Sequence, residues 1–315
     1  MNRLYRWLPE STADRRVRVL AWASLVSQTL IVGTGGAVRL TGSGLGCPTW
    51  PRCSEDSFVA TPEMGIHGIV EFGNRLLTFV LVIIAILAFL SILRLRRERP
   101  ELLRLTVALG LGIPAQAVIG GITVLTELNP WVVGLHFVVS AVLVALATVY
   151  VRRVYRGPTS GALAVPERVR LLALATAVGV WITVLIGIVV TGSGPHAGDG
   201  GAARNGLDSE LLQHFHSWPA YVTFGLTVLL IAVASRVGHA PLLRSAIALI
   251  AVEGVQIAVG IAQARLGLPV VLVGVHMVLA CVLVAVMTLV VLTTKQTAAE
   301  AAARGATAPR ETVAA

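Results

Sequence analysis

Eight apolar runs, each about as long as one membrane crossing, recur along this chain. They lie at roughly 19–40, 67–93, 103–124, 131–151, 171–191, 213–235, 245–264 and 270–293. About 20 apolar residues cross the hydrocarbon core of a bilayer as one α-helix, because a helix satisfies its backbone hydrogen bonds internally. Only 13% of the residues are charged, against about a quarter in soluble domains. The sequence therefore predicts an all-α, polytopic membrane protein with eight transmembrane helices.

The basic residues are divided unequally between the two sides of this membrane protein. Of 25 Lys and Arg, 20 fall on the side that carries both termini, and the other five are Arg39, Arg52, Arg75, Arg204 and Arg265. Positive residues stay on the cytoplasmic side, which predicts a multi-pass protein of the cell membrane with both termini in the cytoplasm. The net charge of +9 is scattered over short loops, so the partner it indicates is the lipid bilayer and not nucleic acid.

The chain contains an internal repeat. Residues 107–150 match 247–290 at a constant shift of 140, with 14 identities in 44 positions. A Thr-Gly-Ser-Gly sequence also follows both the first span and the fifth. The repeat predicts two tandem four-helix bundles, with the informative matches Gln116/Gln256, Gly120/Gly260, Gly134/Gly274 and His136/His276. The expected units are an N-terminal half at 1–151, a cytoplasmic linker at 152–170, a C-terminal half at 171–293 and a disordered tail at 294–315.

Five of the seven histidines lie at one depth, towards the outer ends of the spans. Ionisable groups within a membrane are costly and indicate function. His216 and His276 lie on even-numbered spans of the C-terminal half, where two neutral imidazoles could bind one heme iron from opposite sides. The N-terminal half has His136 as the repeat partner of His276, but only Asn74 or His67 as a partner for His216. This asymmetry predicts one permanent heme and one substrate site.

Two further features beside these histidines have two interpretations each. Glu71 could transfer protons, or it could pair with Arg75 one helical turn away. Cys47 and Cys53 flank a short outer loop, where a disulfide is plausible on the oxidising side of a membrane. That disulfide could hold the loop in place or pass electrons. Cys281, within the last span, is expected to be a small buried hydrophobic residue.

Taken together, these segments resemble the heme A synthase family over about 19–293. The resemblance rests on Gly-Gly-Ala-Val-Arg-Leu-Thr-Gly-Ser-Gly-Leu-Gly-Cys-Pro at 35–48, Cys-Pro-Thr-Trp-Pro-Arg-Cys at 47–53 and Glu-Phe-Gly-Asn-Arg at 71–75. His136, the Gln-His-Phe-His sequence at 213–216 and Val-His-Met at 275–277 complete it. The family oxidises a ring methyl of heme O, through hydroxylated intermediates, to the formyl group of heme A for cytochrome oxidase.

The resemblance implies a role for each candidate residue. His216 and His276 would bind the iron of a heme b cofactor, and Glu71 would be the acidic catalytic residue. His136 would be a ligand of the substrate heme, in a site completed by His67, Asn74 and Arg75. Cys47 and Cys53 would be the cysteine pair of the outer loop. Heme O would be the substrate, with heme O synthase and an electron donor as candidate partners.

The chain departs from the family pattern at one position. Many members have Glu-x-x-His-Arg in the second span, whereas Asn74 stands here in place of the histidine. His67 could substitute, the substrate heme could have one protein ligand, or that histidine could be dispensable. A non-catalytic di-heme b electron carrier is the alternative function. It predicts four axial histidines, two in each half, so Asn74 counts against it.

Overall fold

The computed structural model describes residues 8–307 and confirms the eight predicted spans. Each of the eight helices is long and apolar enough to cross a membrane. Most extend beyond the apolar run that predicted them. Their bounds are α1 (Arg15–Leu40), α2 (Gly65–Ile92), α3 (Pro100–Leu125), α4 (Pro130–Arg156), α5 (Glu167–Ser193), α6 (Ser209–Val237), α7 (Ala240–Arg265) and α8 (Val270–Thr293). Short 3-10 helices at Pro62–Met64 and Leu93–Leu95 flank α2.

Polar residues just before several helices explain where those helices begin. The side chains of Asp14, Asn129 and Asp208 accept hydrogen bonds from backbone N–H groups in the first turns of α1, α4 and α6. Such caps satisfy donors that have no partner within the helix. Pro100 and Pro130 occupy the first positions of α3 and α4, where a missing N–H is harmless.

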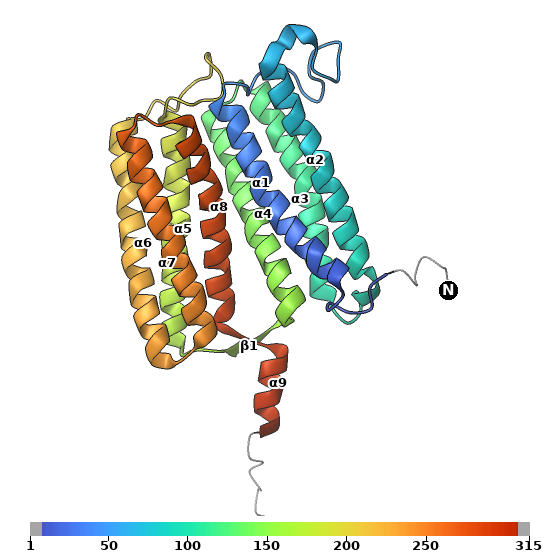
Figure 1. Cartoon of the computed structure of the whole chain (residues 1–315), viewed down its shortest axis with the longest axis vertical. Coiled ribbons are helices and arrows are strands. Elements are labelled where there is room, and N and C mark those ends of the chain that lie inside the picture. Colours follow the sequence, from blue (N-terminus) through green and yellow to red (C-terminus); the bar gives the residue numbers. More distant parts are fainter. Residues whose placement is uncertain (1–7, 308–315) are drawn as a thin grey trace, which may run out of the picture.

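The helices form two four-helix units side by side, α1–α4 and α5–α8, as Figure 1 shows. The units meet where α8 packs against α1 and α4, and where α4 packs against α5. Val32, Val144 and Cys281 form a buried cluster at this boundary, so Cys281 is the buried residue that was expected. We call the end of the molecule with the segment 41–64 the loop end, and the opposite end the α9 end.

The tail does not follow the prediction. Residues 295–297 form β2 (Lys295–Thr297), which pairs antiparallel with β1 (Thr159–Leu163) of the linker, and α9 (Ala298–Thr307) points away from the bundles (Figure 1). Thr297 and Glu300 exchange backbone and side-chain hydrogen bonds, an arrangement that begins helices. The expectation of disorder therefore does not hold for residues 295–307, and the rest of the predicted tail lies outside the described residues.

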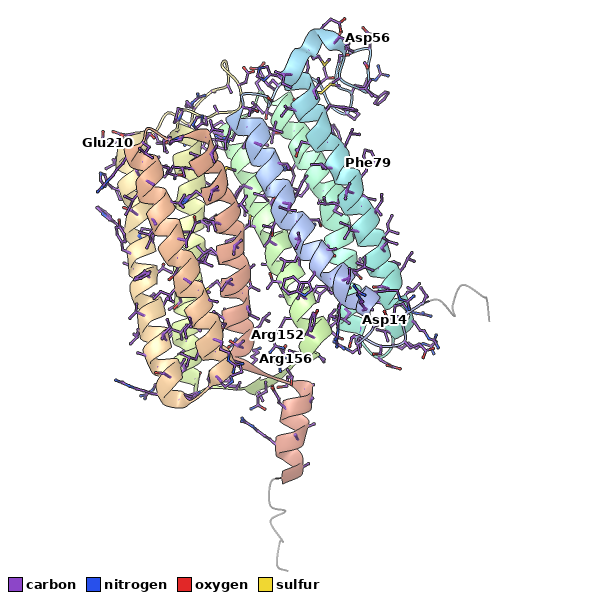
Figure 2. All side chains as sticks on the ribbon, viewed as in Figure 1. Asp14, Asp56, Phe79, Arg152, Arg156 and Glu210 are labelled. Carbon is purple, nitrogen blue, oxygen red and sulfur yellow. A yellow bond between two sulfur atoms is a disulfide. The ribbon has the colours of Figure 1, made fainter. Side chains whose placement is uncertain are left out.

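The linker lies close to these elements. Arg152 and Arg156 of α4 lie at the α9 end (Figure 2), and α4 continues to Arg156 before the strand begins. The Gln296 side chain donates a hydrogen bond to the Leu163 carbonyl at 2.7 Å. The connection between the two halves is thus tied to the segment that follows α8.

Candidate functional site

A cavity of ≈1690 Å³ runs through both halves of the molecule, with a lining drawn from all eight spans. It exceeds the roughly 300–1,000 Å³ of most small-molecule sites. Six of the residues singled out in the sequence line it together: Glu71, Asn74, Arg75, His136, His216 and His276.

Glu71 lies on α2 near the loop end and is buried, with 6% of the residue exposed. Its Oε1 is 2.5 Å from Arg75 Nη2, and its Oε2 accepts a hydrogen bond of 2.7 Å from the backbone N–H of Cys47. The predicted ion pair is present. Because Glu71 also lines the cavity, the pairing with Arg75 leaves the proton-transfer interpretation open as well.

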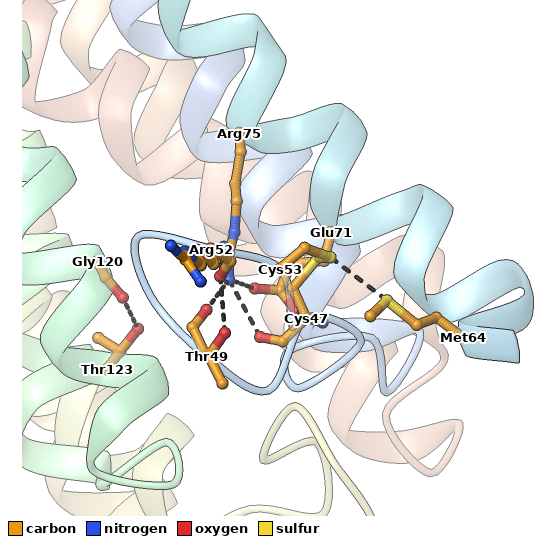
Figure 3. A network of polar contacts seen from close by, with 9 residues as sticks. All are labelled: Cys47, Thr49, Arg52, Cys53, Met64, Glu71, Arg75, Gly120 and Thr123. Atoms are coloured by element: carbon orange, nitrogen blue, oxygen red, sulfur yellow. Dashed lines mark hydrogen bonds and ion pairs between the residues drawn. A yellow bond between two sulfur atoms is a disulfide. The ribbon is translucent and has the colours of Figure 1, made fainter. Parts of the chain in front are cut away.

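Arg75 joins the outer loop to α2. Its guanidinium donates hydrogen bonds of 3.1 Å to the carbonyl oxygens of Cys47, Thr49 and Arg52, as Figure 3 shows. Cys47 and Cys53 form the expected disulfide, and both are fully buried. One guanidinium and one disulfide thus hold the loop directly over the Glu71 carboxylate.

The same loop closes the cavity of the N-terminal half. A Cβ atom built on Gly121 of α3 would come within 2.3 Å of the Trp50 ring, and one on Gly46 within 2.2 Å of the His67 carbonyl oxygen. Side chains at these two positions would push the loop away from the helices. Glycine at 46 and 121 is therefore required for the loop to pack against α2 and α3.

His136 of α4 is held by contacts with the neighbouring helix α3. The Gln116 side chain of α3 donates a hydrogen bond of 3.1 Å to the backbone carbonyl of His136. A Cβ on Gly120 would lie 3.3 Å from His136 Cε1, so the ring packs directly on the α3 backbone. The buried Nδ1 of this ring has no hydrogen-bond partner among the described residues.

His276 of α8 makes the equivalent contacts with α7 in the C-terminal half. Gln256 donates to the His276 carbonyl at 3.2 Å, and a Cβ on Gly260 would lie 3.4 Å from His276 Cε1. Its Nδ1 is likewise buried without a partner in the described part of the chain. The repeat found in the sequence is therefore also a repeat of side-chain packing.

His216 faces His276 across the cavity. Its Nδ1 lies 3.0 Å from the Thr183 carbonyl oxygen, which can only accept, so Nδ1 carries the proton and Nε2 keeps its lone pair. A Cβ on Gly187 would lie 2.8 Å from His216 Cε1, so this ring also needs a glycine beside it. The ring centres of His216 and His276 are 6.2 Å apart.

That separation fits one iron between the two rings. An iron bonded to one nitrogen of each imidazole at about 2 Å would separate the ring centres by about 6 Å. Within residues 8–307, no group of three or more His, Cys, Asp and Glu side chains could hold a metal ion. The pair is therefore suited to a metal that brings its other ligands with it, as iron in a porphyrin does.

In the described part of the N-terminal half, no such pair lines the cavity. Asn74 lines the cavity where His216 stands in the other half, and its Oδ1 accepts a hydrogen bond of 2.8 Å from Thr34. His67 is exposed, contacts Ser43 at 2.9 Å and is not among the residues that line the cavity. His136 is thus the histidine that this half contributes to the cavity from its helices.

Sequence comparison agrees with this architecture. The family described as cytochrome oxidase assembly protein, COX15-CtaA, matches residues 18–288. The chain belongs to this family.

Individual relatives of this family member are similar over shorter stretches. Three are each named heme A synthase: those of Geobacillus thermodenitrificans (31% identical over 119 residues), Bacillus pumilus strain SAFR-032 (37% over 126) and Lysinibacillus sphaericus strain C3-41 (29% over 133). These matches cover 38%, 38% and 42% of this chain. The chain spans only 37%, 38% and 43% of the length of these curated relatives.

Two cavity residues of this family member were not predicted for the site. Arg39 of α1 donates hydrogen bonds to the carbonyls of Thr191 and His196, at 2.9 and 2.7 Å, and so joins the two halves at the loop end. Its position within the predicted span 19–40 is a signal, since an ionisable group inside a span indicates function. Trp50 also lines the cavity, and its packing on α3 depends on a loop conformation that spacing does not predict.

Proposed function

We propose that this protein oxidises heme O to heme A. The observation that carries the proposal is the asymmetry of the cavity. One half presents two imidazoles spaced for one iron, and the other presents His136 with the Glu71 carboxylate and no second imidazole from its helices. A permanent cofactor is best held by two ligands, whereas a substrate must enter, react and leave.

His216 and His276 would hold heme b in the C-terminal half. Bound there, heme b would supply one-electron transfer beside the reaction site. The chain contributes the positions of both rings, through the Thr183 carbonyl and the glycines against which the rings pack. Arg39 contributes a guanidinium at the loop end of the cavity, and this group pairs well with carboxylates such as the heme propionates.

The proposed reaction converts a methyl group and water into a formyl group, four protons and four electrons. The electrons pass to an external electron acceptor. Glu71 would accept protons at its carboxylate oxygens, because it is the buried carboxylate of the N-terminal half that lines the cavity. The Cys47 N–H and Arg75 keep the carboxylate in place. His136 would bind the iron of the substrate from one side, and Asn74 would leave the other side without a strong protein ligand.

Pigment extraction tests this proposal. The chain is expressed in cells that supply heme O, and the hemes bound to the purified protein and to the membranes are identified by mass. We expect heme A in the membranes and heme b in the purified protein. Bound heme b without any heme A would favour the non-catalytic electron carrier.

We also propose that both termini face the cytoplasm and that the loop end faces outward across the cell membrane. The distribution of 20 basic residues against five supports this orientation. Heme O synthase would deliver the substrate from within the same bilayer. For the reaction as balanced above, the separate redox partner at the heme b site would be the electron acceptor, in place of the electron donor expected from the resemblance. Reporter fusions after residues 60 and 160 test the orientation, with activity expected from a periplasmic reporter only at the first position.

A further inference from the structure

The cavity penetrates deeper from the loop end in the N-terminal half than in the C-terminal half. On α2 its lining runs from Glu71 to Phe89, whereas on α6 it ends at Thr223. Between the second and sixth spans the repeat shift is 142, since Glu71-Phe-Gly-Asn74 aligns with Gln213-His-Phe-His216, and Leu81 therefore aligns with Thr223. The eight further residues on α2 correspond to about 12 Å of helix.

The neighbouring helices differ in the same way. On α3 the lining reaches Thr106, whereas on α7 it ends at Glu253, the repeat counterpart of Ile113. The seven further residues on α3 add about 10 Å. Because α2 and α3 pack against each other, the two extensions form one feature, which we call the α2–α3 groove.

The wall of the α2–α3 groove is apolar. The one hydroxyl among its deep residues, on Thr106, donates to carbonyls of its own helix at 3.0 and 3.2 Å and offers no donor to a ligand. Phe79 and Leu111, at 65% and 66% exposure, line the cavity at its outer edge, and Figure 2 shows Phe79 on the outside of α2. The deep lining otherwise consists of Val82, Ala85, Ile86, Phe89, Val107, Gly110 and Leu111.

A buried hydrogen bond ends the cavity at the equivalent depth of the C-terminal half. Thr227 Oγ1 of α6 donates to Glu253 Oε1 of α7 at 2.9 Å, and both side chains are at most 5% exposed. Their repeat counterparts in the N-terminal half are Ala85 and Ile113, which cannot form this bond. The link between α6 and α7 thus has no equivalent between α2 and α3.

A second difference lies one turn deeper. Gly110 of α3 lines the groove, and a Cβ built on it would meet nothing within 4 Å. Its counterpart on α7 is Ile250, a branched residue that is half-buried and does not line the cavity. At two positions, Ala85 and Gly110, the N-terminal half thus has a smaller residue than its C-terminal counterpart, Thr227 or Ile250.

We propose that the α2–α3 groove binds the hydroxyethylfarnesyl chain of heme O. This inference rests on the proposed function. Heme O differs from heme B in carrying this apolar chain in place of a vinyl group, and the groove leads from the reaction site at Glu71 into an apolar, lipid-accessible wall. The chain can therefore enter sideways from the bilayer. The closed C-terminal site rejects the same chain by shape, so each half selects its own heme.

Exchange of one residue between the halves tests the proposal. Gly110→Ile introduces the residue of the C-terminal half into the groove. The matched control is Gly225→Ile on α6, an exposed glycine outside the cavity where a Cβ also meets nothing within 4 Å. Each protein is purified in detergent with its resident heme b bound in the C-terminal half. Heme O or, separately, additional heme B is then titrated into the protein, and the affinity for each added heme is measured. An unchanged heme b spectrum shows that the variant has folded.

We expect the wild-type protein and Gly225→Ile to bind heme O at least ~10-fold more tightly than heme B, and Gly110→Ile to lose this preference. Ala85→Phe, which fills the groove from α2, should have the same effect if Gly110→Ile does not accumulate. Equal binding of both hemes by the wild-type protein, or an intact preference in the groove variants, would overturn the proposal. A third outcome separates the groove from the proposed function. If the wild-type protein prefers heme O and Gly110→Ile abolishes this preference, but the wild-type protein forms no heme A, the groove is upheld and the proposed oxidation is refuted.

Discussion

Each half of this protein holds one histidine by the same contacts, and the halves differ in the residue that lies opposite this histidine. His136 and His276 each receive a glutamine hydrogen bond at the backbone carbonyl and pack on a glycine. Opposite His276 lies His216 at 6.2 Å between ring centres, whereas the corresponding position in the other half is Asn74. Both copies of the repeat thus have the same packing of a histidine against the neighbouring helix. They differ at a side chain that faces the cavity, which is Asn74 in one half and His216 in the other.

The loops at the loop end reinforce this difference. In the N-terminal half, the disulfide loop donates a backbone N–H to Glu71 and inserts Trp50 against α3. In the C-terminal half, Gln213 occupies the repeat position of Glu71, and the side chain of Asn205 ties its loop to the Val189 carbonyl at 2.8 Å. One half is built around a carboxylate and the other around a pair of imidazoles.

The largest expected effect separates the two histidines of the repeat. His276→Ala should abolish the low-spin heme b spectrum and all heme A formation, because the iron loses an axial ligand. His136→Ala should keep the heme b spectrum and lose heme A formation. Optical spectra of the purified variants measure the heme b, and pigment extraction from the membranes measures heme A formation. An unchanged spectrum in His276→Ala would reject His276 as an axial ligand.

Removal of the carboxylate should affect the N-terminal half alone. Glu71→Ala should reduce heme A formation by about 10²–10⁴-fold, the usual contribution of a positioned acid or base, and leave heme b bound. Glu71→Gln is the matched variant, since it keeps the size of the side chain and removes its charge. Heme A extracted per unit of protein is the readout. Undiminished product from both variants would refute the role given to Glu71.

A change at Asn74 should make the two halves alike. Asn74→His provides a second imidazole opposite His136, so a heme bound there should become six-coordinate and low-spin. We expect heme O to bind more tightly and heme A formation to fall by ~10-fold, because the substrate iron is then held from both sides. Electron paramagnetic resonance of the protein loaded with heme O measures the spin state. A high-spin substrate heme in this variant would show that position 74 does not reach the iron.

The smallest expected effect concerns the disulfide. Replacement of Cys47 and Cys53 by serine removes a cross-link that closes a short loop, worth about 2 kcal/mol. Arg75 still binds three carbonyls of this loop, so heme A formation should fall less than ~10-fold and the thermal midpoint by a few degrees. Complete loss of activity with retained heme b would instead favour a redox-active cysteine pair.

Several features of the fold were predictable because their signals are local or periodic. The eight spans follow from apolar length, and the repeat follows from identities at a constant shift. Two cysteines in one outer loop predict a disulfide, and the structure contains it. The ordered segment 295–307 was missed, although Thr297 and Glu300 form a recognisable helix-start pattern, because its strand partner lies far away in the linker.

The sequence by itself determined which residues meet at the loop end, because helix length and repeat position fix the depth of each side chain in a membrane. Only the tertiary structure decided which of these residues share one cavity. His67 has the right depth but turns towards Ser43, whereas Arg39 and Trp50 line the cavity. The depth of the α2–α3 groove also required the structure, because it depends on a hydrogen bond between helices that exists in one half and not in the other. Depth is a property of one helix, whereas an enclosed site depends on the rotation and contacts of several helices together.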